Sequence, residues 1–214
     1  MSENINFDYI TDYLRSLIKP REGLLKQIEE KAHKEESYVP IAEPETVTFL
    51  KFLTAATGAH KILEIGTGSA YTSISLALCG AEVVTIERYE KVYNEALKNI
   101  EKSGLSEKIN AIFGDAADVL PTLEGSFDMI FLDAAKGQYI NFLPQLQRLL
   151  KKGGILVSDN VLYKGMTAME GIAVRRKVTI IKRLRKYLGE ISENPLFITS
   201  VLPLGDGVAV SYKK

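Results

Sequence analysis

Short apolar runs alternate with amphipathic stretches from about residue 60 to the end of this chain. The runs cover residues 61–65, 82–86, 109–113, 127–132 and 154–158, and the stretches between them begin near Tyr71, Tyr89, Ala116 and Gln138. Runs that are apolar on both faces are typical of parallel strands, whose sheet is covered by helices on each side. The alternation therefore predicts a doubly wound α/β fold.

The two ends of the chain add to this pattern. Apolar stripes over residues 7–17, 24–32 and 47–53 predict three N-terminal helices, and Pro44 and Gly58 suit the start and the end of the third. Near the C-terminus, runs at 196–202 and 207–212 flank the turn sequence Pro203-Leu-Gly-Asp-Gly, so we expect an antiparallel hairpin at the sheet edge. The expected architecture is a seven-stranded, mostly parallel sheet in a single domain over residues 1–214, with a helical appendage at 1–58 and a core at 59–214.

Composition excludes several classes of function. Lys plus Arg and Asp plus Glu both total 27, so the chain has no net charge to attract nucleic acid or membranes as a whole. One cysteine and two histidines cannot supply an internal disulfide or a Cys/His zinc site. The sequence contains no apolar stretch long enough to span a membrane and no signal-peptide pattern at its start. We expect a reduced, cytoplasmic protein with no membrane partner.

A glycine-rich turn follows the first predicted strand. It reads Glu64-Ile-Gly-Thr-Gly-Ser69, and Glu87 ends the next strand about 20 positions beyond Gly66. In a doubly wound sheet such glycines let a ligand approach a helix N-terminus, while the acid accepts hydrogen bonds from ribose hydroxyls. Tyr71 stands where a dinucleotide fingerprint has a third small residue. The sequence predicts a nucleoside site without a pyrophosphate; the alternative is a tight turn with a solvated acid beside it.

The third predicted strand ends at Gly114-Asp115-Ala116. Asp115 would therefore lie at the same sheet edge, where it could accept a hydrogen bond from an adenine amino group. Aspartate is also a favoured N-cap for a following helix. Both interpretations stay open.

Polar side chains also follow the fourth and fifth predicted strands. Asp133 ends the fourth strand, and Asp159 and Asn160 end the fifth. Neighbouring strands lie only ~5 Å apart, so these oxygens can converge on one point. Two carboxylates and an amide oxygen suit a hard cation such as Mg²⁺, although each residue alone could equally cap a helix or turn.

Lys136 lies three residues after Asp133. A lysine beside a divalent cation and a cationic cofactor would have reason to lose its proton, which makes Lys136 a candidate general base in catalysis together with Asp133. The alternative is a solvated surface lysine.

Three motifs together resemble the cation-dependent class I S-adenosylmethionine (SAM) O-methyltransferases, the family of catechol and caffeoyl-CoA O-methyltransferases. They are residues 64–73, residues 128–133 with Lys136 and Tyr139, and residues 159–165. The resemblance implies a Mg²⁺ site at Asp133, Asp159 and Asn160 and a SAM site that includes Glu87 on the ribose. The other SAM contacts that we expect on this basis are Val39, Glu64, Gly66, Ser69, Asp115 and Asp133. It also suggests a homodimer.

Within that family, the compact segment between Gly165 and Arg175 looks most like the bacterial tRNA 5-hydroxyuridine methyltransferases, which act on the wobble base of the anticodon loop. The chain shows no obvious long insertion that would recognise an acyl carrier. This resemblance implies methylation of 5-hydroxyuridine to 5-methoxyuridine. A small-molecule catechol-type methyltransferase is the leading alternative, and a non-catalytic nucleotide-binding or RNA-binding module is a third.

A basic stretch fits the tRNA interpretation. Seven of the twelve residues from 175 to 186 are Lys or Arg and none is acidic, within an apolar stripe from Val174 to Leu188 that predicts the last crossover helix. Phosphate contacts dominate nucleic-acid affinity, so we expect tRNA to contact Arg175, Arg176, Lys182 and Arg183. The alternative is a solvated helix face.

Overall fold

The computed structural model describes residues 5–34, 39, 41–170 and 177–214. Its helices are α1 (Asp8–Ser16), α2 (Gly23–Ala32), α3 (Pro44–Thr57), α4 (Tyr71–Ala77), α5 (Glu90–Ser103), α6 (Ala116–Val119), α7 (Tyr139–Leu149) and α8 (Val178–Glu193), with short 3₁₀ turns η2 (Leu120–Thr122) and η3 (Lys136–Gln138). The strands are β1 (Lys61–Ile65), β2 (Glu82–Glu87), β3 (Ile109–Phe113), β4 (Phe127–Leu132), β5 (Leu150–Ser158), β6 (Phe197–Leu202) and β7 (Val208–Lys213).

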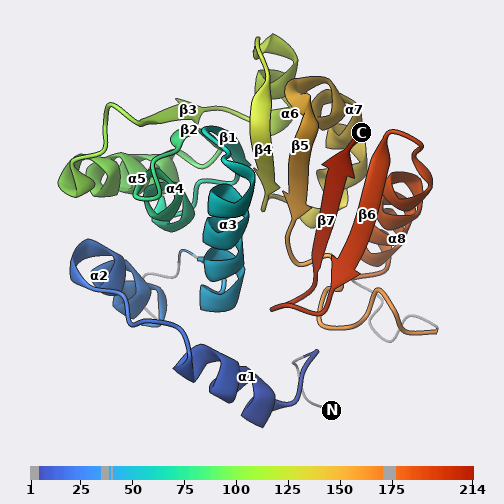
Figure 1. Cartoon of the computed structure of the whole chain (residues 1–214), viewed down its shortest axis with the longest axis horizontal. Helices are drawn as coiled ribbons and strands as arrows, with labels where there is room; N and C mark the ends of the chain where they lie inside the picture. Colours follow the sequence, from blue (N-terminus) through green and yellow to red (C-terminus); the bar gives the residue numbers. More distant parts are fainter. Residues whose placement is uncertain (1–4, 35–38, 40, 171–176) are drawn as a thin grey trace.

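The strands form one sheet in the order β3-β2-β1-β4-β5-β7-β6 (Figure 1). Strands β1 to β5 pair in parallel, and β7 pairs antiparallel with both β5 and β6. This confirms the predicted seven-stranded sheet and its C-terminal hairpin. The strand order reverses between β1 and β4, which is where doubly wound folds bind their ligands.

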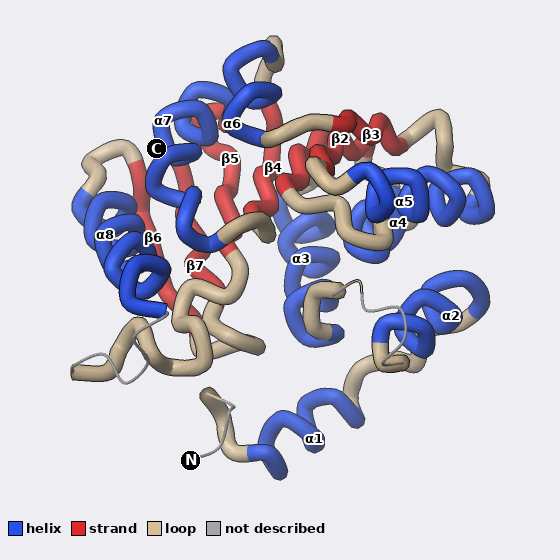
Figure 2. Tube along the Cα trace, turned by 180° about the vertical axis from the view of Figure 1, so that it is seen from behind, coloured by secondary structure: helices blue, strands red, loops and turns tan. Residues whose placement is uncertain are grey.

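Helices cover both faces of the sheet. Ile62 of β1 belongs to an apolar cluster with residues of α3, α4 and α5, whereas its neighbour Leu63 belongs to a second cluster with residues of α6, α7 and α8. The view from behind shows α7 and α8 in front of the strands, on the face that is turned away in Figure 1 (Figure 2). Successive side chains of a strand point to opposite faces of the sheet. Because helices cover both faces, the side chains on both faces are buried, which explains why the strand sequences are apolar throughout.

One boundary differs from the sequence prediction, and another falls on residues outside the described ranges. Strand β5 begins at Leu150 rather than at 154, because Leu150 pairs with Phe127 before the register shifts and Met129 pairs with Ile155. A bulge of this kind is not visible in an apolar pattern. The apolar stripe predicts that the last helix starts near Val174, but residues 171–176 lie outside the described residues. Within the described residues, α8 begins at Val178.

The ends of the predicted third N-terminal helix are confirmed. Pro44 occupies the first turn of α3, and Gly58 ends it in a left-handed conformation. Across the described ranges, no helix is long and apolar enough to cross a membrane.

Candidate active site

The carboxyl ends of the central strands surround a cleft of about 680 Å³. Most of the predicted site residues line this cleft: Val39, Gly66, Ser69, Glu87, Asp115, Asp133, Lys136, Asp159 and Asn160. The fold therefore brings together residues that lie more than a hundred positions apart in the chain.

The glycine turn packs directly against the end of β4. Gly66 has φ +101°, and a Cβ placed there would lie 2.1 Å from the backbone oxygen of Asp133. A side chain at this position would both strain the backbone and push β1 away from β4. Gly66 therefore sets the close approach of the predicted nucleoside site to the predicted cation site.

Glu87 holds the same turn from the side. Its Oε2 accepts a hydrogen bond from the Gly68 backbone N–H at 3.1 Å, and its Oε1 accepts one from the Tyr89 N–H at 2.9 Å. The carboxylate is nearly buried and lines the cleft. Each oxygen keeps a second lone pair for a ribose hydroxyl.

Ser69 lines the cleft and carries a buried hydroxyl, Oγ, that has no hydrogen-bond partner among the described residues. A buried hydroxyl without a partner is unfavourable, so a polar group of a ligand is the natural partner for it. This supports the predicted contact between Ser69 and a cofactor.

Asp115 caps a helix, which confirms one of its two interpretations, whereas the adenine contact stays a prediction. Its Oδ1 caps α6 by accepting from the Ala117 N–H at 2.9 Å, while the side chain lines the cleft. Its other oxygen lies 3.5 Å from Arg88.

Glu64 does not line the cleft, contrary to the expectation that it contacts the cofactor. It is buried beneath the turn, where it accepts hydrogen bonds from the hydroxyls of Ser73 and of Thr85, the latter at 2.7 Å. Side chains alternate along β1, so Glu64 lies on the same face as Ile62, which packs with α4, and there it meets Ser73 of α4. Glu64 supports the turn from below instead of touching the ligand.

Burial raises the pKa of Glu64 to about 8, although the Ser73 and Thr85 hydroxyls oppose this shift. The folded chain then binds a proton that the unfolded chain releases above its ordinary pKa of 4.5. The contribution of Glu64 to the free energy of unfolding is therefore fully present below about pH 4.5 and is lost as the pH rises towards 8.

When the pH rises from about 5 to about 9, we expect the free energy of unfolding to fall less in the variant Glu64→Gln than in the wild type, because glutamine does not ionise. Urea unfolding of both proteins across this range measures the difference. Parallel pH profiles would contradict the buried, protonated state of Glu64.

Asp133 and Asp159 lie side by side at the ends of β4 and β5. Leu132 pairs with Ser158 immediately before them, and the Asp159 N–H donates to the Leu132 carbonyl at 3.0 Å. Burial raises the pKa of the Asp159 carboxyl, and the neighbouring charge of Asp133 raises it further. Asn160 follows in a left-handed conformation with φ 53° and also faces the cleft.

Tyr139, the first residue of α7, clamps these two strand ends. Its hydroxyl lies 3.0 Å from the backbone oxygens of both Leu132 and Asp159, and its ring is fully buried against Tyr187. The sequence showed Tyr139 as part of a motif, but only the structure shows this clamping contact.

Lys136 begins η3 and pairs with Asp133. Its Nζ lies 2.5 Å from Asp133 Oδ1 and 5.6 Å from the centre of the Tyr139 ring. Burial alone would lower the pKa of Lys136, but Asp133, Tyr139 and Asp159 outweigh burial and raise it. With these neighbours, Lys136 carries its proton and is an ammonium ion. The loss of this proton, which the sequence analysis expects, would require a change in the surroundings of Lys136.

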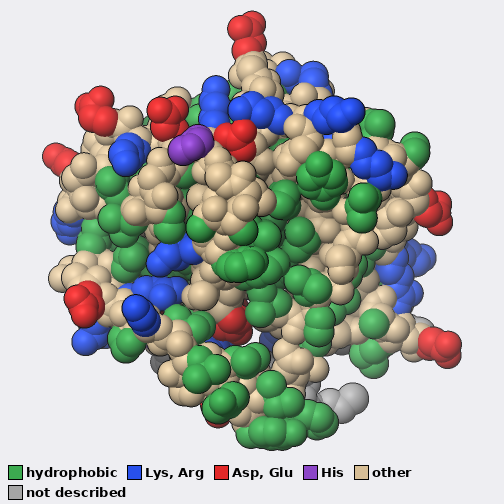
Figure 3. Space-filling view, viewed as in Figure 1, with side chains coloured by type: hydrophobic (Ala, Val, Ile, Leu, Met, Phe, Trp, Pro, Cys, Tyr) green, Lys and Arg blue, Asp and Glu red, His purple; other side chains and the backbone are tan. Residues whose placement is uncertain are grey.

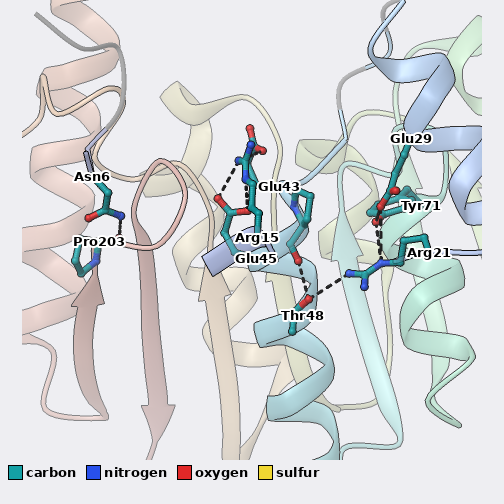
Figure 4. A network of polar contacts seen from close by, with 10 residues as sticks. Asn6, Arg15, Arg21, Glu29, Glu43, Glu45, Thr48, Tyr71 and Pro203 are labelled. Atoms are coloured by element: carbon teal, nitrogen blue, oxygen red, sulfur yellow. Dashed lines mark hydrogen bonds and ion pairs between the residues drawn. The ribbon is translucent and has the colours of Figure 1, made fainter. Parts of the chain in front are cut away.

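The N-terminal helices are tied to the cleft by polar contacts (Figure 4). Arg21 donates to the Tyr71 hydroxyl and to Thr48 Oγ1, both at 3.2 Å, and the Tyr71 hydroxyl donates to Glu29. Tyr71 itself lines the cleft. The tyrosine that replaces a small residue in the glycine motif therefore anchors the segment between α1 and α2.

The basic helix is partly occupied with contacts inside the chain. Arg183 donates to the Gly137 carbonyl at 3.1 Å, Arg185 donates to the Thr167 carbonyl at 2.8 Å, and Lys186 lies 3.5 Å from Glu190. Lys182 is exposed. The predicted RNA contacts Arg175 and Arg176 lie outside the described residues. The number of Lys and Arg residues in the sequence does not show which of these side chains make contacts within the chain and which remain available to bind RNA.

Comparisons with known proteins agree with this geometry. The model of the O-methyltransferase family matches residues 17–214. Caffeoyl-CoA O-methyltransferase 1 of Zea mays is 31% identical and the match covers 95% of this chain and 83% of the relative. Catechol O-methyltransferase of Mycobacterium tuberculosis is 32% identical over 76% of each chain.

Solved structures show the same fold. A protein of Staphylococcus aureus described as a caffeoyl-CoA O-methyltransferase superposes with a TM-score of 0.89 at 32% identity, over 97% of this chain and 100% of that one. A methyltransferase of Podospora anserina, solved with S-adenosylhomocysteine bound, gives 0.85 at 26% identity over 97% and 94%. With a family match over most of its length and a cleft suited to a nucleoside, this chain belongs to the O-methyltransferase family and is a SAM-dependent enzyme of the caffeoyl-CoA and catechol type.

Proposed function

We propose that this enzyme methylates one of two adjacent oxygens on a small aromatic acceptor, using a hard divalent cation such as Mg²⁺ held by Asp133, Asp159 and Asn160. The observation that carries the proposal is the position of these three oxygen-bearing side chains, which line the same cleft as the glycine turn and Glu87. The names of the catechol and caffeoyl-CoA relatives fit an acceptor of this class.

The residues present fit a cation of this kind. The donor set consists of carboxylate and amide oxygens, which hard cations prefer. The raised pKa of Asp159 beside Asp133 indicates two carboxyl groups that repel each other in a buried place. A dication between them would relieve this repulsion. Among the described residues, no group of three or more His, Cys, Asp or Glu side chains is placed to hold a metal, so the proposed site depends on two carboxylates and the Asn160 amide.

SAM fits the other half of the cleft. Glu87 would accept from its ribose, Asp115 would lie on the adenine side, and the free Ser69 hydroxyl would contact its polar end. The turn at Gly66 then fixes the donor next to Asp133 at the reacting end. Holding the methyl group and the acceptor oxygen in line is itself a large part of the rate enhancement.

Lys136 is the proposed proton acceptor. A cation bound at the site would polarise the acceptor hydroxyl and lower its pKa. Burial favours the neutral form of the Lys136 amine, and the ion pair with Asp133 opposes it. A dication held by Asp133 and Asp159 would offset the two carboxylate charges that keep the proton on Lys136, so that burial would favour the neutral amine and Nζ could take the proton of the hydroxyl that is methylated.

A tRNA acceptor is the second candidate, as 5-hydroxyuridine also presents two adjacent oxygens. The contact of Arg183 with Gly137 favours it, because this contact places the basic helix α8 beside the turn that carries Lys136. A wobble base splayed out of an anticodon loop could then reach the cleft while its backbone contacts α8. The internal contacts of Arg183 and Arg185 leave Lys182 as the described cation best placed for phosphate.

An acceptor panel with labelled SAM tests both candidates. We expect methylation of vicinal-diol aromatics that requires Mg²⁺ or Mn²⁺ and stops after complete chelation. Activity that survives chelation would contradict the cation site. Efficient transfer to hydroxyuridine-containing tRNA, weakened in Lys182→Ala and more strongly at high salt, would favour the second candidate over the first.

We also propose that the chain forms a homodimer. Hydrophobic side chains gather over the middle of one face of the molecule and over α1 below it (Figure 3). Phe7, Tyr13 and Leu17 on and beside α1, Phe52 on α3 and Ile198 on β6 are largely exposed. Apolar surface of this extent supports an interface between two copies. Light scattering in solution decides between monomer and dimer.

A further inference from the structure

The segment that follows the two strand-end ligands of β5 has an unusual backbone. Asn160, Tyr163 and Lys164 all have positive φ, at 53°, 47° and 56°. Among the described non-glycine residues, one other has a positive φ, which is Ala70 in the glycine turn. Left-handed conformations of this kind are unfavourable for side chains larger than glycine, and they persist where surrounding contacts impose them.

The turn between β6 and β7 supplies these contacts. The Val161 N–H donates to the Gly207 carbonyl at 2.9 Å, and the Leu162 N–H donates to the Asp206 carbonyl at 3.1 Å. The Lys164 N–H donates to the Asp206 carboxylate, at Oδ1. Three backbone groups of the strained segment are thus held by two consecutive residues of one turn.

The packing of this turn leaves it no room to move away. A Cβ at Gly207 would lie 2.4 Å from the Leu162 side chain, so the turn rests directly on the segment. On its other side, a Cβ at Gly205 would lie 3.2 Å from Thr46 Oγ1 of α3. The turn is therefore wedged between α3 and residues 160–164.

We infer that Asp206 is a positioning residue of the active site, whose carboxylate holds the Lys164 end of segment 160–164 and thereby helps to fix Asn160 beside Asp159. This inference rests on the proposed cation site. Metal ligands are commonly oriented by hydrogen bonds, and loss of a partner that bonds the ligand itself weakens metal binding about 10–100-fold. Asp206 acts on Asn160 through the backbone of residues 161–164, so its effect should lie at the lower end of this range.

Charge is the competing explanation for any effect of Asp206. Its carboxylate is half-buried and lies in the electrostatic field of Lys136, Lys164 and Lys177, and of Asp159 as the facing acid. Asparagine at this position separates the two explanations, because its amide oxygen still accepts from the Lys164 N–H but carries no charge.

The test measures binding of Mn²⁺ by calorimetry or electron paramagnetic resonance in Asp206→Ala, Asp206→Asn and the wild type, together with SAM affinity and amide exchange at Lys164. We expect Asp206→Ala to bind Mn²⁺ about tenfold more weakly and to exchange the Lys164 amide faster. Asp206→Asn should restore most of both, and SAM affinity should change little in either variant.

Asp128→Ala is the matched control. The Asp128 carboxylate also accepts from backbone N–H groups, those of His60 at 3.0 Å and Lys61 at 2.7 Å, but it stands near the start of β4, away from the cleft. This variant should lose stability and keep its affinity for Mn²⁺. An equal loss of affinity in both alanine variants would mean that general destabilisation explains the effect, and would overturn the inference.

Two other outcomes would also overturn it. Wild-type affinity in Asp206→Ala would show that Asn160 needs no support, and a loss in Asp206→Asn equal to that in Asp206→Ala would assign the effect to charge. If the wild type binds no Mn²⁺ at all, the proposed cation site fails and the inference fails with it. The first two results leave the cation site intact, so the failures are distinguishable.

Discussion

Replacement of Asp159 by alanine is expected to abolish methyl transfer while leaving most of the SAM affinity in place. Asp159 lines the cleft next to Asp133, whereas Glu87, the proposed ribose acid, and the glycine turn would hold the cofactor from β2 and the end of β1. Loss of a direct ligand should exceed the ~10–100-fold loss that follows removal of a supporting partner. The expected result is therefore a rate at background level.

The fold around Asp159 should survive this change. Its backbone carbonyl is held by the Tyr139 hydroxyl, and its N–H by the Leu132 carbonyl, both independent of the side chain. The carboxylate accepts from the neighbouring Asn160 N–H at 2.7 Å, a short local contact. Thermal unfolding by circular dichroism checks that the variant is folded, and calorimetry measures its SAM affinity.

Asp159→Asn is the graded comparison, because it keeps one oxygen ligand and loses the charge. Its rate should lie between those of the alanine variant and the wild type, with partial recovery at high Mg²⁺ concentration. An alanine variant that retains more than about a tenth of the wild-type rate would contradict the assignment of Asp159 as a cation ligand.

Sequence patterns were sufficient for the parts of the site that lie at strand ends. Asp133 and Asp159 follow apolar runs, and parallel strands in one sheet must deliver their carboxyl ends to one edge. Glu87 follows for the same reason. The glycine turn is predictable because Gly66 allows an approach that any side chain would block.

The rest of the site depends on contacts between distant segments. Arg21 reaches Tyr71, 50 residues away, and Asp206 reaches Lys164, 42 residues away. In the sequence Asp206 is a turn residue, and turn chemistry explains it fully without any role in the site. Glu64 shows the opposite error, as its place in the motif suggested a ligand contact that burial beneath the turn prevents.

Lys136→Met should lower kcat by about 10²–10⁴-fold, the usual contribution of a general acid or base, and should change SAM affinity little. Methionine keeps the apolar length of the side chain against the Tyr139 ring and removes the amine that contacts Asp133. Lys151→Met is the matched control: Lys151 also pairs with an aspartate, Asp128, at 2.6 Å, but it does not line the cleft.

The size of the loss separates proton transfer from structural support. A lysine that only balances Asp133 would, when removed, free that carboxylate for a cation, so Mg²⁺ affinity would rise while kcat fell little. A proton acceptor would instead give a large loss of kcat that is smaller for acceptors whose hydroxyl has a lower pKa, since these need less help to ionise. Rates for acceptors of graded acidity therefore decide between the two. A drop below about tenfold that is the same for all acceptors would remove Lys136 from the chemical step.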